Sequence, residues 1–360
     1  MAMSYNVIPI QEKDNREICK LYEKAFKQPM CNYNSHDIFL WFYFNNIYSK
    51  HYCKGLHNGK NFASYWGFVP LDCIVNGKIY KGSLSFQLVS SREVLGATLS
   101  LWKKIKDDLI NDNVVLSFTI NHENSVQLLK NIGWKVESTP ILVKIVHPFM
   151  LINDLISKTI SNRIIKKIFC LILRPLDYFL SKLTALFYNN NDKVYEVRCL
   201  DENYNKLWEI MSNSVNNGVN LDARYVNWRY IEKPNNTYKI LSYVDGDRVM
   251  GYLIYDTKKA FGTHIGFIMD IIADPYNKNV INSLIHYAKK ELSQKGVTII
   301  SALSFKENIF YKNLKGAGFI NLPKKFFPRR SYFSIKNFIE SENDFEVNKW
   351  HISWGNHDNL

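Results

Sequence analysis

The chain has 360 residues, of which 46% are hydrophobic and 14% are aromatic, so a disordered or fibrous protein is excluded and two packed domains are expected. Lysine and arginine together number 46 against 33 acidic residues, which gives a formal net charge of +13. This charge favours an anionic partner, such as a nucleotide-bearing cofactor, a nucleic acid or a phospholipid surface.

The six cysteines are scattered along the chain without a CxxC pair, which argues against a structural metal site and against a disulfide framework. We therefore expect reduced thiols and no bound metal. The N-terminal segment lacks a signal-peptide core, and the longest apolar run, at 168–173, is too short to cross a bilayer. These features predict a cytoplasmic protein.

The first half of the chain contains an ordered series of elements, and the helix among them has Leu95, Leu99, Trp102 and Leu109 at helical spacing. In chain order the elements are an aromatic segment at Trp41, a hairpin turn at Asn58-Gly59, a strand over 82–90, a helix from 96 to about 110, a strand over 113–120 and a short helix ending at Gly133.

The second half contains a series of the same kinds in the same order. Its members are an aromatic segment at Trp228, a turn at Asp245-Gly246, a strand over 264–274, a helix marked by Val280, Leu284, Ala288 and Leu292, a strand over 296–303 and a short helix ending at Gly318. The interval from Trp41 to Gly133 is 92 residues, and that from Trp228 to Gly318 is 90. Matched order and spacing favour a duplication over two unrelated domains.

The predicted fold is therefore of the α/β (α+β) class, with two tandem domains that are each a mixed sheet flanked by helices. The domains are expected over 1–146 and 193–360. A basic amphipathic helical segment over 147–192 matches neither half, and it is expected either to brace the two domains or to contact a membrane as a peripheral element at its inner face.

The repeated unit resembles the GNAT acetyltransferase superfamily. The likeness rests on the strand, loop, helix and strand order and on "NSVQLLKNIGW" (124–134). The chain is especially similar to the tandem-GNAT proteins of bacterial polysaccharide gene sets, through Trp228-Arg229-Tyr230 with Pro234 and through the closing "KWHISWGNHDNL" (349–360). This resemblance implies an acyl-CoA cofactor, with acetyl-CoA favoured, and an amino sugar or nucleotide sugar as the acceptor.

The resemblance also implies that backbone amides in a strand-to-helix loop, usually [QR]xxGx[GA], hold the cofactor's pyrophosphate. In the first half this loop reads Glu93-x-x-Gly96-x-Thr98, whereas the second half has Pro275 and no glycine. We therefore predict that the cofactor binds the first domain. The predicted cofactor-binding residues are Leu88, Val89, Arg92, Gly96, Ala97, Thr98 and Asn124. The alternatives are that Gly96-Ala97 only allow close packing and that Asn124 only caps a helix.

Acyl transfer to an amine needs a base, and the candidates are Asp270, on an apolar strand of the second half, and Glu93 in the loop. The competing interpretation of Asp270 is a structural carboxylate. In many superfamily members a tyrosine four residues before the closing glycine-aromatic pair acts as the acid. Leu129 and Leu314 stand at those positions here, so a standard general-acid mechanism is in doubt.

The aromatic segments supply the candidate substrate-binding residues, because aromatic rings stack on sugars or bases and a guanidinium binds phosphate. These candidates are Trp41, Trp228, Arg229 and Tyr230. Core packing is the favoured alternative for the two tryptophans, which leaves Arg229 as the stronger functional candidate. Two further functions stay open: a Fem-like transferase that takes its donor from charged tRNA, and a non-catalytic scaffold whose cofactor sites have both decayed.

Overall fold

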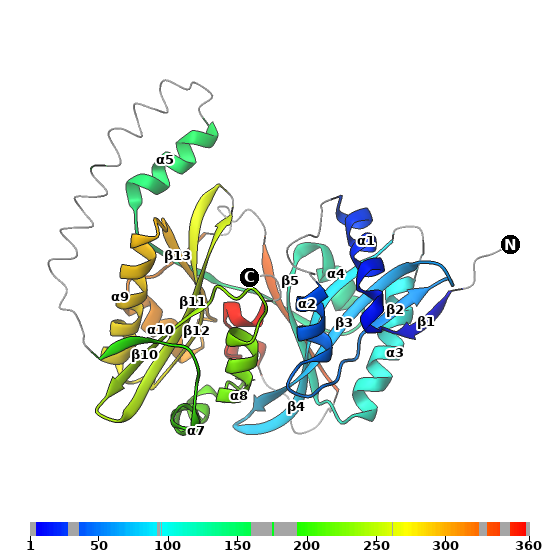
Figure 1. Ribbon diagram of the computed structural model, residues 1–360, viewed down its shortest axis with the longest axis horizontal. Helices are drawn as coiled ribbons and strands as arrows, with labels where there is room; N and C mark the ends of the chain where they lie inside the picture. The colour runs from blue at the N-terminus through cyan, green and yellow to red at the C-terminus, as the bar shows by residue number, and fades with distance from the viewer. Residues whose placement is uncertain are drawn as a thin grey trace.

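The computed structural model describes residues 5–27, 36–91, 94, 96–159, 175, 193–260, 262–323, 330–338 and 346–357. Two mixed sheets lie side by side, with most of the first half of the chain on the right of Figure 1 and most of the second half on the left. The segment that ends the described chain, 346–357, lies between them, as the red ribbon in Figure 1 shows.

The first sheet has eight strands in the order β1-β2-β3-β4-β5-β15-β6, with β9 paired to β3. Its strands are β1 (Asn6–Pro9), β2 (Lys54–His57), β3 (Phe62–Val75), β4 (Lys78–Ser90), β5 (Leu116–His122), β6 (Lys135–Ser138), β9 (Gly218–Val219) and β15 (Ser331–Asn337). The second sheet has seven strands in the order β14-β7-β13-β12-β11-β10-β8. They are β7 (Ile141–Ile145), β8 (Val194–Val197), β10 (Lys239–Asp245), β11 (Arg248–Ala260), β12 (Thr263–Ala273), β13 (Ile299–Leu303) and β14 (Ile320–Asn321).

The helices pack their apolar stripes against these sheets. They are α1 (Asn15–Phe26), α2 (His36–Phe39), α3 (Ala97–Asn111), α4 (Glu123–Asn131), α5 (Pro148–Thr159), α7 (Glu202–Val215), α8 (Ala223–Val226), α9 (Lys278–Gln294) and α10 (Ile309–Gly316). The helices α3 and α4 share a buried cluster that contains Trp66, Trp102 and Trp134, whereas α1 belongs to a larger cluster that runs through both halves. The two halves therefore share one continuous core.

The expected helix in the first half is present, and Trp102 and Leu109 of the predicted stripe are buried, but Leu99 is not, and Leu95 lies outside the described residues. Leu99 is 53% exposed, while Leu101, Ile105 and Leu109 are buried. Because α3 begins at Ala97, the core-facing stripe follows steps of four residues from that position and leaves Leu99 outside it. In the second half, the predicted stripe through Val280, Leu284, Ala288 and Leu292 is buried, as expected.

The two sheets exchange a strand. The strand β7 follows the elements of the first half, yet it pairs with β13 in the second sheet, and Ile141 lies opposite Leu303. The strand β15 follows the elements of the second half, yet it is inserted between β5 and β6 of the first sheet. The sheets therefore do not divide at the boundary between the segments 1–146 and 193–360, since the first sheet takes β9 and β15 from the second half and the second sheet takes β7 from the first.

Both aromatic segments form a π-helical turn. One spans Leu40–Phe44 and the other Asn227–Ile231, and each has its tryptophan at the second position. The wider turn is seen in its hydrogen bonds, since the amide of Asn45 donates to the carbonyl of Leu40 at 2.8 Å. Each turn precedes three antiparallel strands, a long helix, a strand and a short helix, so the order of elements is the same in the two halves.

The helix α5 opens the segment expected to act as a brace or a membrane contact, and most of that segment lies outside the described residues. Asp154 of α5 accepts a hydrogen bond from the Thr263 hydroxyl at 2.7 Å, which attaches the helix to the end of β12. None of the helices within the described ranges is both long and apolar enough to cross a membrane.

Candidate active site

The N-terminus of α3 presents free backbone amides. Gly96 is the residue before the helix and adopts a left-handed conformation with φ of +75°, which favours glycine. A Cβ placed on Gly96 would have no heavy atom within 4 Å. The first intrahelical bond runs from the amide of Ser100 to the carbonyl of Gly96, so the amides of Ala97, Thr98 and Leu99 have no partner inside the helix. Such amides, together with the helix dipole, favour an anion.

The strands β4 and β5 diverge beside this helix end. They pair in parallel only from Gly82 opposite Leu116 to Leu84 opposite Phe118, although β4 continues to Ser90. In the second part of β4, Gln87 and Leu88 are half-buried, while Val89 is buried. Because the two strands diverge, the last part of β4 does not pair with β5. This part of β4 lies next to the N-terminus of α3.

A bulge in β4 marks the point of divergence. The register with β3 shifts between Tyr65 and Gly67, and Gln87 has a positive φ of 50°. A bulge turns backbone groups out of the ladder, which makes them available to a ligand. The Gln87 side chain is held by the hydroxyl of Tyr43, which donates to its Oε1 at 3.1 Å. The sequence analysis did not identify Tyr43 or Gln87, because a bulge depends on pairing that no local pattern reveals.

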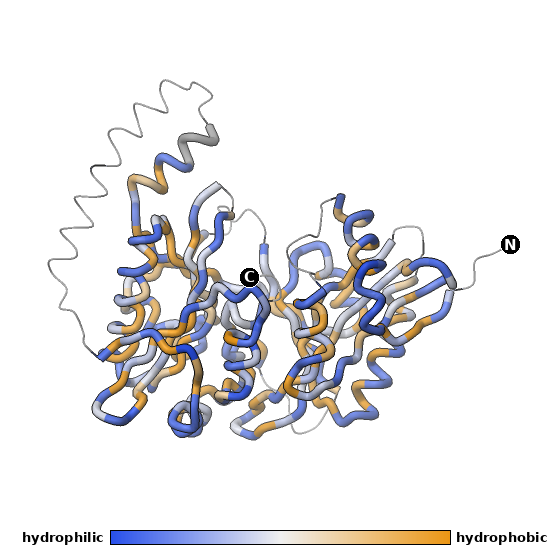
Figure 2. The backbone as a smooth tube through the Cα atoms, viewed as in Figure 1, coloured by the Kyte–Doolittle hydropathy of each residue, from blue (hydrophilic) through white to orange (hydrophobic). Residues whose placement is uncertain are grey.

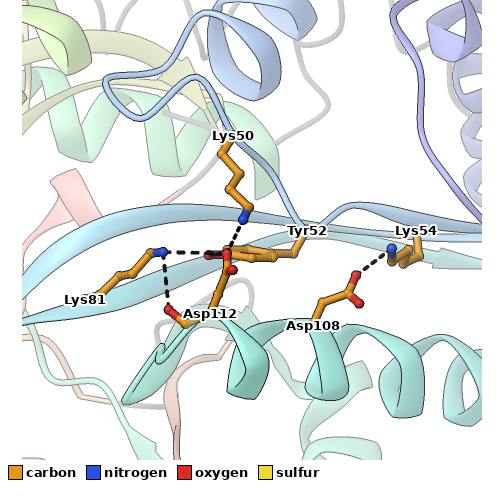
Figure 3. Close-up of polar contacts among 6 residues, drawn as sticks. All are labelled: Lys50, Tyr52, Lys54, Lys81, Asp108 and Asp112. Atoms are coloured by element: carbon orange, nitrogen blue, oxygen red, sulfur yellow. Dashed lines mark hydrogen bonds and ion pairs between the residues drawn. The ribbon is translucent and has the colours of Figure 1, made fainter.

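The far end of α3 is fastened to the sheet by a cluster of lysines and acids (Figure 3). Asp112, just past the helix, accepts a hydrogen bond from Tyr52 at 2.8 Å and forms ion pairs with Lys50 and with Lys81. Hydrogen bonding from Lys50 is the largest influence that lowers the pKa of the Asp112 carboxyl. These contacts hold α3 along the sheet, so that its N-terminus stays beside the divergent part of β4.

In the second half, an aromatic side chain covers the end of the parallel pairing. Here β12 and β13 pair only from Ile265 opposite Ile299 to Phe267 opposite Ser301. Trp354, from the segment that ends the described chain, donates from its Nε1 to the Ser301 hydroxyl at 3.1 Å. Its ring also packs edge-on against Phe267, with 5.4 Å between ring centroids. Trp354 therefore lies against the last residue pair of these two strands. In the first half, Trp350 lies against Phe118 of the last β4–β5 pair in a similar way, with 5.2 Å between ring centroids.

The N-terminus of α9 is also occupied. Asn277 precedes the helix, and its side chain accepts a hydrogen bond from the amide of Val280 at 3.3 Å. This side-chain cap satisfies an amide that a phosphate would otherwise bind. The two halves therefore differ: the end of α3 begins at a glycine that has no side chain to cap it, and the end of α9 is capped by an asparagine.

The carboxylate of Asp270 lies beneath the C-terminal segment and is only 2% exposed. Tyr230 donates a hydrogen bond to its Oδ2, and a Cβ added to Gly355 would come within 2.4 Å of the same oxygen. Burial raises the pKa of Asp270 to about 6, against the lowering effects of hydrogen bonds from Ser353 and Tyr230 and of the Arg229 charge. The segment around Gly355 covers this carboxylate.

Arg229 binds the protein's own backbone in this structure. Its guanidinium donates to the carbonyl oxygens of Gly355 at 3.3 Å and of His357 at 2.8 Å. The side chain is only 2% exposed, and the neighbouring Tyr230 is 1% exposed. The predicted substrate-binding residues of the second half are therefore buried here, and they hold the C-terminal segment against β12.

The two predicted tryptophans meet each other. Trp41 and Trp228 stack with 5.2 Å between ring centroids, and both are buried. The packing alternative considered for them agrees with this geometry, since neither ring faces solvent. Of the remaining candidates, Asn124 is exposed in the first turn of α4, while Glu93 and Arg92 lie outside the described residues. Among the described residues, no three His, Cys, Asp or Glu side chains form a group that could hold a metal.

No family model and no curated protein matches the sequence, but solved structures match the fold. N-myristoyltransferase of Saccharomyces cerevisiae with bound myristoyl-CoA aligns with 100% of this chain and 87% of its own, at a TM-score of 0.59 and 10% identity. A probable N-acyltransferase from Enterococcus faecalis V583 aligns with 93% of this chain and 72% of its own, at a TM-score of 0.56 and 13% identity. A GCN5-related N-acetyltransferase from Anabaena variabilis aligns with 93% of this chain and 73% of its own, at a TM-score of 0.60 and 9% identity. The protein has the two-domain GNAT fold.

Within this GNAT fold, the two positions at which the resemblance would place a general-acid tyrosine belong to the core. Leu129 of α4 is 2% exposed and Leu314 of α10 is 3% exposed, so neither position faces a site. The chain is thus similar in fold to acyl-CoA-dependent N-acyltransferases, while the identities of 9–13% compare architecture alone.

Proposed function

We propose that this protein is a cytoplasmic acyl-CoA-dependent N-acyltransferase that binds its cofactor on the N-terminal domain. The acyl group is acetyl, and the acceptor is the amine of an amino sugar or sugar nucleotide used in surface polysaccharide biosynthesis. The acceptor class rests on the resemblance of the sequence to tandem-GNAT proteins. The cofactor assignment rests on the fold and on the difference between the two halves.

The observation that carries the proposal is the contrast between the ends of α3 and α9. Within the described residues, the first amides of α3 have no partner inside the helix, and they lie beside the divergent part of β4. The α9 end is capped by Asn277. A pyrophosphate needs free amides and close approach to the backbone, and the α3 end offers both. We therefore assign Gly96, Ala97 and Thr98 to the pyrophosphate and Leu88 and Val89 to the pantetheine arm.

The reaction follows from the chemistry of a thioester and an amine. The neutral amine attacks the acyl carbonyl, a carbon–nitrogen bond forms, the carbon–sulfur bond breaks, and the coenzyme leaves as a thiolate that takes a proton from solvent. The ammonium proton formed in the attack goes to a base, for which we propose Asp270. Because Gly355 covers this carboxylate, its action requires the C-terminal segment to move away from β12 when the acceptor binds.

Calorimetric titration with acetyl-CoA tests the cofactor assignment. We expect saturable binding, and weaker binding of acetyl-pantetheine, because that fragment lacks the pyrophosphate that the α3 amides would hold. Myristoyl-CoA titrated in parallel examines the acyl length. If a folded sample releases no heat with either thioester at high micromolar concentration, the proposed function is wrong and the scaffold alternative is preferred.

A further inference from the structure

A tyrosine contact is repeated in the two halves of the chain. Tyr43 and Tyr230 are each the fourth residue of a π-helical turn, and each hydroxyl donates a hydrogen bond to a side chain on a long strand. In the first half the acceptor is Gln87 of β4, and in the second half it is Asp270 of β12. The same hydroxyl therefore meets an amide in one half and a carboxyl group in the other.

Gln87 and Asp270 occupy equivalent positions in the two sheets. Gln87 lies three residues beyond Leu84, which ends the parallel pairing of β4 with β5. Asp270 lies three residues beyond Phe267, which ends the parallel pairing of β12 with β13. The antiparallel pairing with the preceding strand also shifts its register at this point in both halves. The contact is thus a feature of the repeated unit, and the chemistry of the acceptor is what differs.

The Tyr43 hydroxyl reaches β4 from the face of the sheet that is opposite α3. A Cβ added to Gly67 of β3 would come within 2.5 Å of this hydroxyl, so the missing side chain at Gly67 makes room for it. The neighbouring Trp66 points to the other face, where its ring packs against Trp102 of α3 at 5.5 Å between centroids. Tyr43 and the proposed pyrophosphate site at the N-terminus of α3 therefore lie on different sides of the sheet.

The contact also restrains the backbone of the β4 bulge. Hydrophobic segments run through the interior of both domains (Figure 2), and Tyr43 is buried in the larger of the two apolar clusters. A hydrogen bond is stronger in such surroundings than in water. Gln87 has a positive φ of 50°, a conformation that a residue with a side chain rarely adopts unless its surroundings hold it there. The Tyr43 hydroxyl supplies such a restraint.

The backbone on the other side of the bulge is held as well. The Ser64 hydroxyl of β3 donates to the carbonyl of Val89 at 2.9 Å. Leu88 therefore lies between two anchored residues, Gln87 and Val89, where β4 no longer pairs with β5. With both ends of this short stretch fixed, side chains of the protein set the path of the backbone beside the proposed pantetheine site.

We propose that Tyr43 is a positioning residue for the pantetheine arm of acyl-CoA and that it acts through Gln87. Its hydroxyl keeps Gln87 in the left-handed conformation, and this keeps the backbone of Leu88 and Val89 aligned with the arm. Because the bulge is ordered during folding, the cofactor does not have to order it on binding, and its affinity is higher. This inference rests on the proposed function, in which β4 holds the pantetheine arm.

Calorimetric titration with ligands that each share one part of acyl-CoA tests this role. Acetyl-pantetheine carries the arm without the pyrophosphate, and ADP carries a pyrophosphate without the arm. We expect Tyr43→Phe to weaken the binding of acetyl-CoA and of acetyl-pantetheine by about threefold to tenfold, the effect of one hydrogen bond, and to leave ADP binding unchanged. Gln87→Met removes the acceptor of the same hydrogen bond, so the variant with both substitutions should bind no more weakly than Tyr43→Phe alone.

The matched control is Tyr230→Phe, which removes the equivalent hydroxyl from the second half. Urea denaturation should show similar destabilisation for the two tyrosine variants, but Tyr230→Phe should bind all three ligands as the wild type does. If Tyr43→Phe loses as much affinity for ADP as for acetyl-pantetheine, or if the two tyrosine variants lose affinity equally, a general loss of structure replaces the positioning role. Unchanged affinity of Tyr43→Phe for acetyl-pantetheine would also overturn the inference.

The same titrations separate this inference from the proposed function. If the wild type and Tyr43→Phe bind acetyl-CoA equally well, only the role of Tyr43 is contradicted. If the wild type binds ADP but not acetyl-pantetheine, either directly or by displacing acetyl-CoA, then β4 does not hold the arm and Tyr43 does not position it. A folded wild type that binds neither thioester contradicts the proposed function and this inference together.

Discussion

Trp41 and Trp228, which stand 187 residues apart in the chain, stack on each other at the centre of the molecule, and the indole Nε1 of Trp41 donates to the carbonyl of Trp228 at 3.1 Å. Each is the second residue of a π-helical turn, so equivalent positions of the two halves are in direct contact. The two aromatic segments thus join the halves.

A double-mutant cycle measures this contact. Trp41→Phe and Trp228→Phe each keep an aromatic ring but reduce the stacked area, and Trp41→Phe also removes the indole donor. We expect each to lower the free energy of unfolding by about 1–3 kcal/mol, with a coupling between them of about 0.5–1.5 kcal/mol in urea denaturation. Trp102 lies in the separate cluster under α3, so the destabilisation by Trp102→Phe should add to that by Trp41→Phe without coupling. Additivity of Trp41 with Trp228 would contradict the contact.

Gly96→Val tests the phosphate site. A Cβ at Gly96 has no heavy atom of the described residues within 4 Å, so the valine would enter the space proposed for the pyrophosphate, and we expect the affinity for acetyl-CoA to fall at least tenfold in calorimetry. Valine is also strained at a positive φ. Gly296→Val controls for this, since Gly296 has φ of +72° and equally open surroundings beyond the end of α9. Equal losses of affinity in the two variants would assign the effect to strain.

Asn277→Val examines the other half. Loss of the side-chain cap on α9 should lower the free energy of unfolding by about 1 kcal/mol, measured by urea denaturation, and leave acetyl-CoA affinity unchanged. If this variant loses the cofactor while Gly96→Val keeps it, the two halves have been assigned the wrong way round.

Asp270 gives the protein a distinctive pH dependence. Its pKa is raised to about 6 from 3.8, so the folded state keeps a proton that the unfolded state releases. Stability from this group is therefore greatest below about pH 4 and falls by about 1.4 kcal/mol per pH unit until about pH 6. Asp270→Asn should remove this slope in denaturation curves recorded across that range. A slope that survives the substitution would have to come from another group.

The same residue separates a catalytic role from a structural one. If Asp270 is the base, the rate of acyl transfer rises through about pH 6, and Asp270→Asn lowers kcat about 10²–10⁴-fold with an unchanged affinity for acetyl-CoA. Tyr230→Phe removes a hydrogen bond that lowers this pKa, so the pH profile should move to higher pH. An unaltered kcat in Asp270→Asn would leave only the structural role.

Asp112→Asn loosens the far end of α3. The Asp112 pKa is lowered in the folded state, so its contribution is present at neutral pH and is lost as the pH falls below the ordinary carboxyl range. We expect about 0.5–1 kcal/mol of destabilisation at pH 7, smaller at high salt, in urea denaturation. Asp245→Asn breaks the more exposed pair with Lys193 and should have almost no effect. Equal destabilisation by the two substitutions would mean that the cluster at the end of α3 stabilises the fold no more than an exposed ion pair does.

Much of the fold could be predicted from local patterns. The apolar period through Val280 and Leu284 predicted α9, and the glycine turns at Gly59 and Gly246, both with positive φ, predicted the hairpins. The free end of α3 at Gly96 was also expected, because a glycine at a strand-to-helix junction is a local feature. These features depend on the conformational preferences of neighbouring residues, which the order of amino acids states directly.

The tertiary structure decided what depends on partners distant in the chain. A strand's sequence shows that it will pair but not with which edge, so the exchange of β7 and β15 could not be predicted. Likewise, the composition of Arg229 and Tyr230 suits both a binding rim and a core. The contact with Gly355, which is more than 120 residues away, shows that Arg229 belongs to the core. The raised pKa of Asp270 was expected from its apolar strand, but the segment that covers this carboxylate was not. Burial is a property of the whole assembled core, and the local sequence does not encode it.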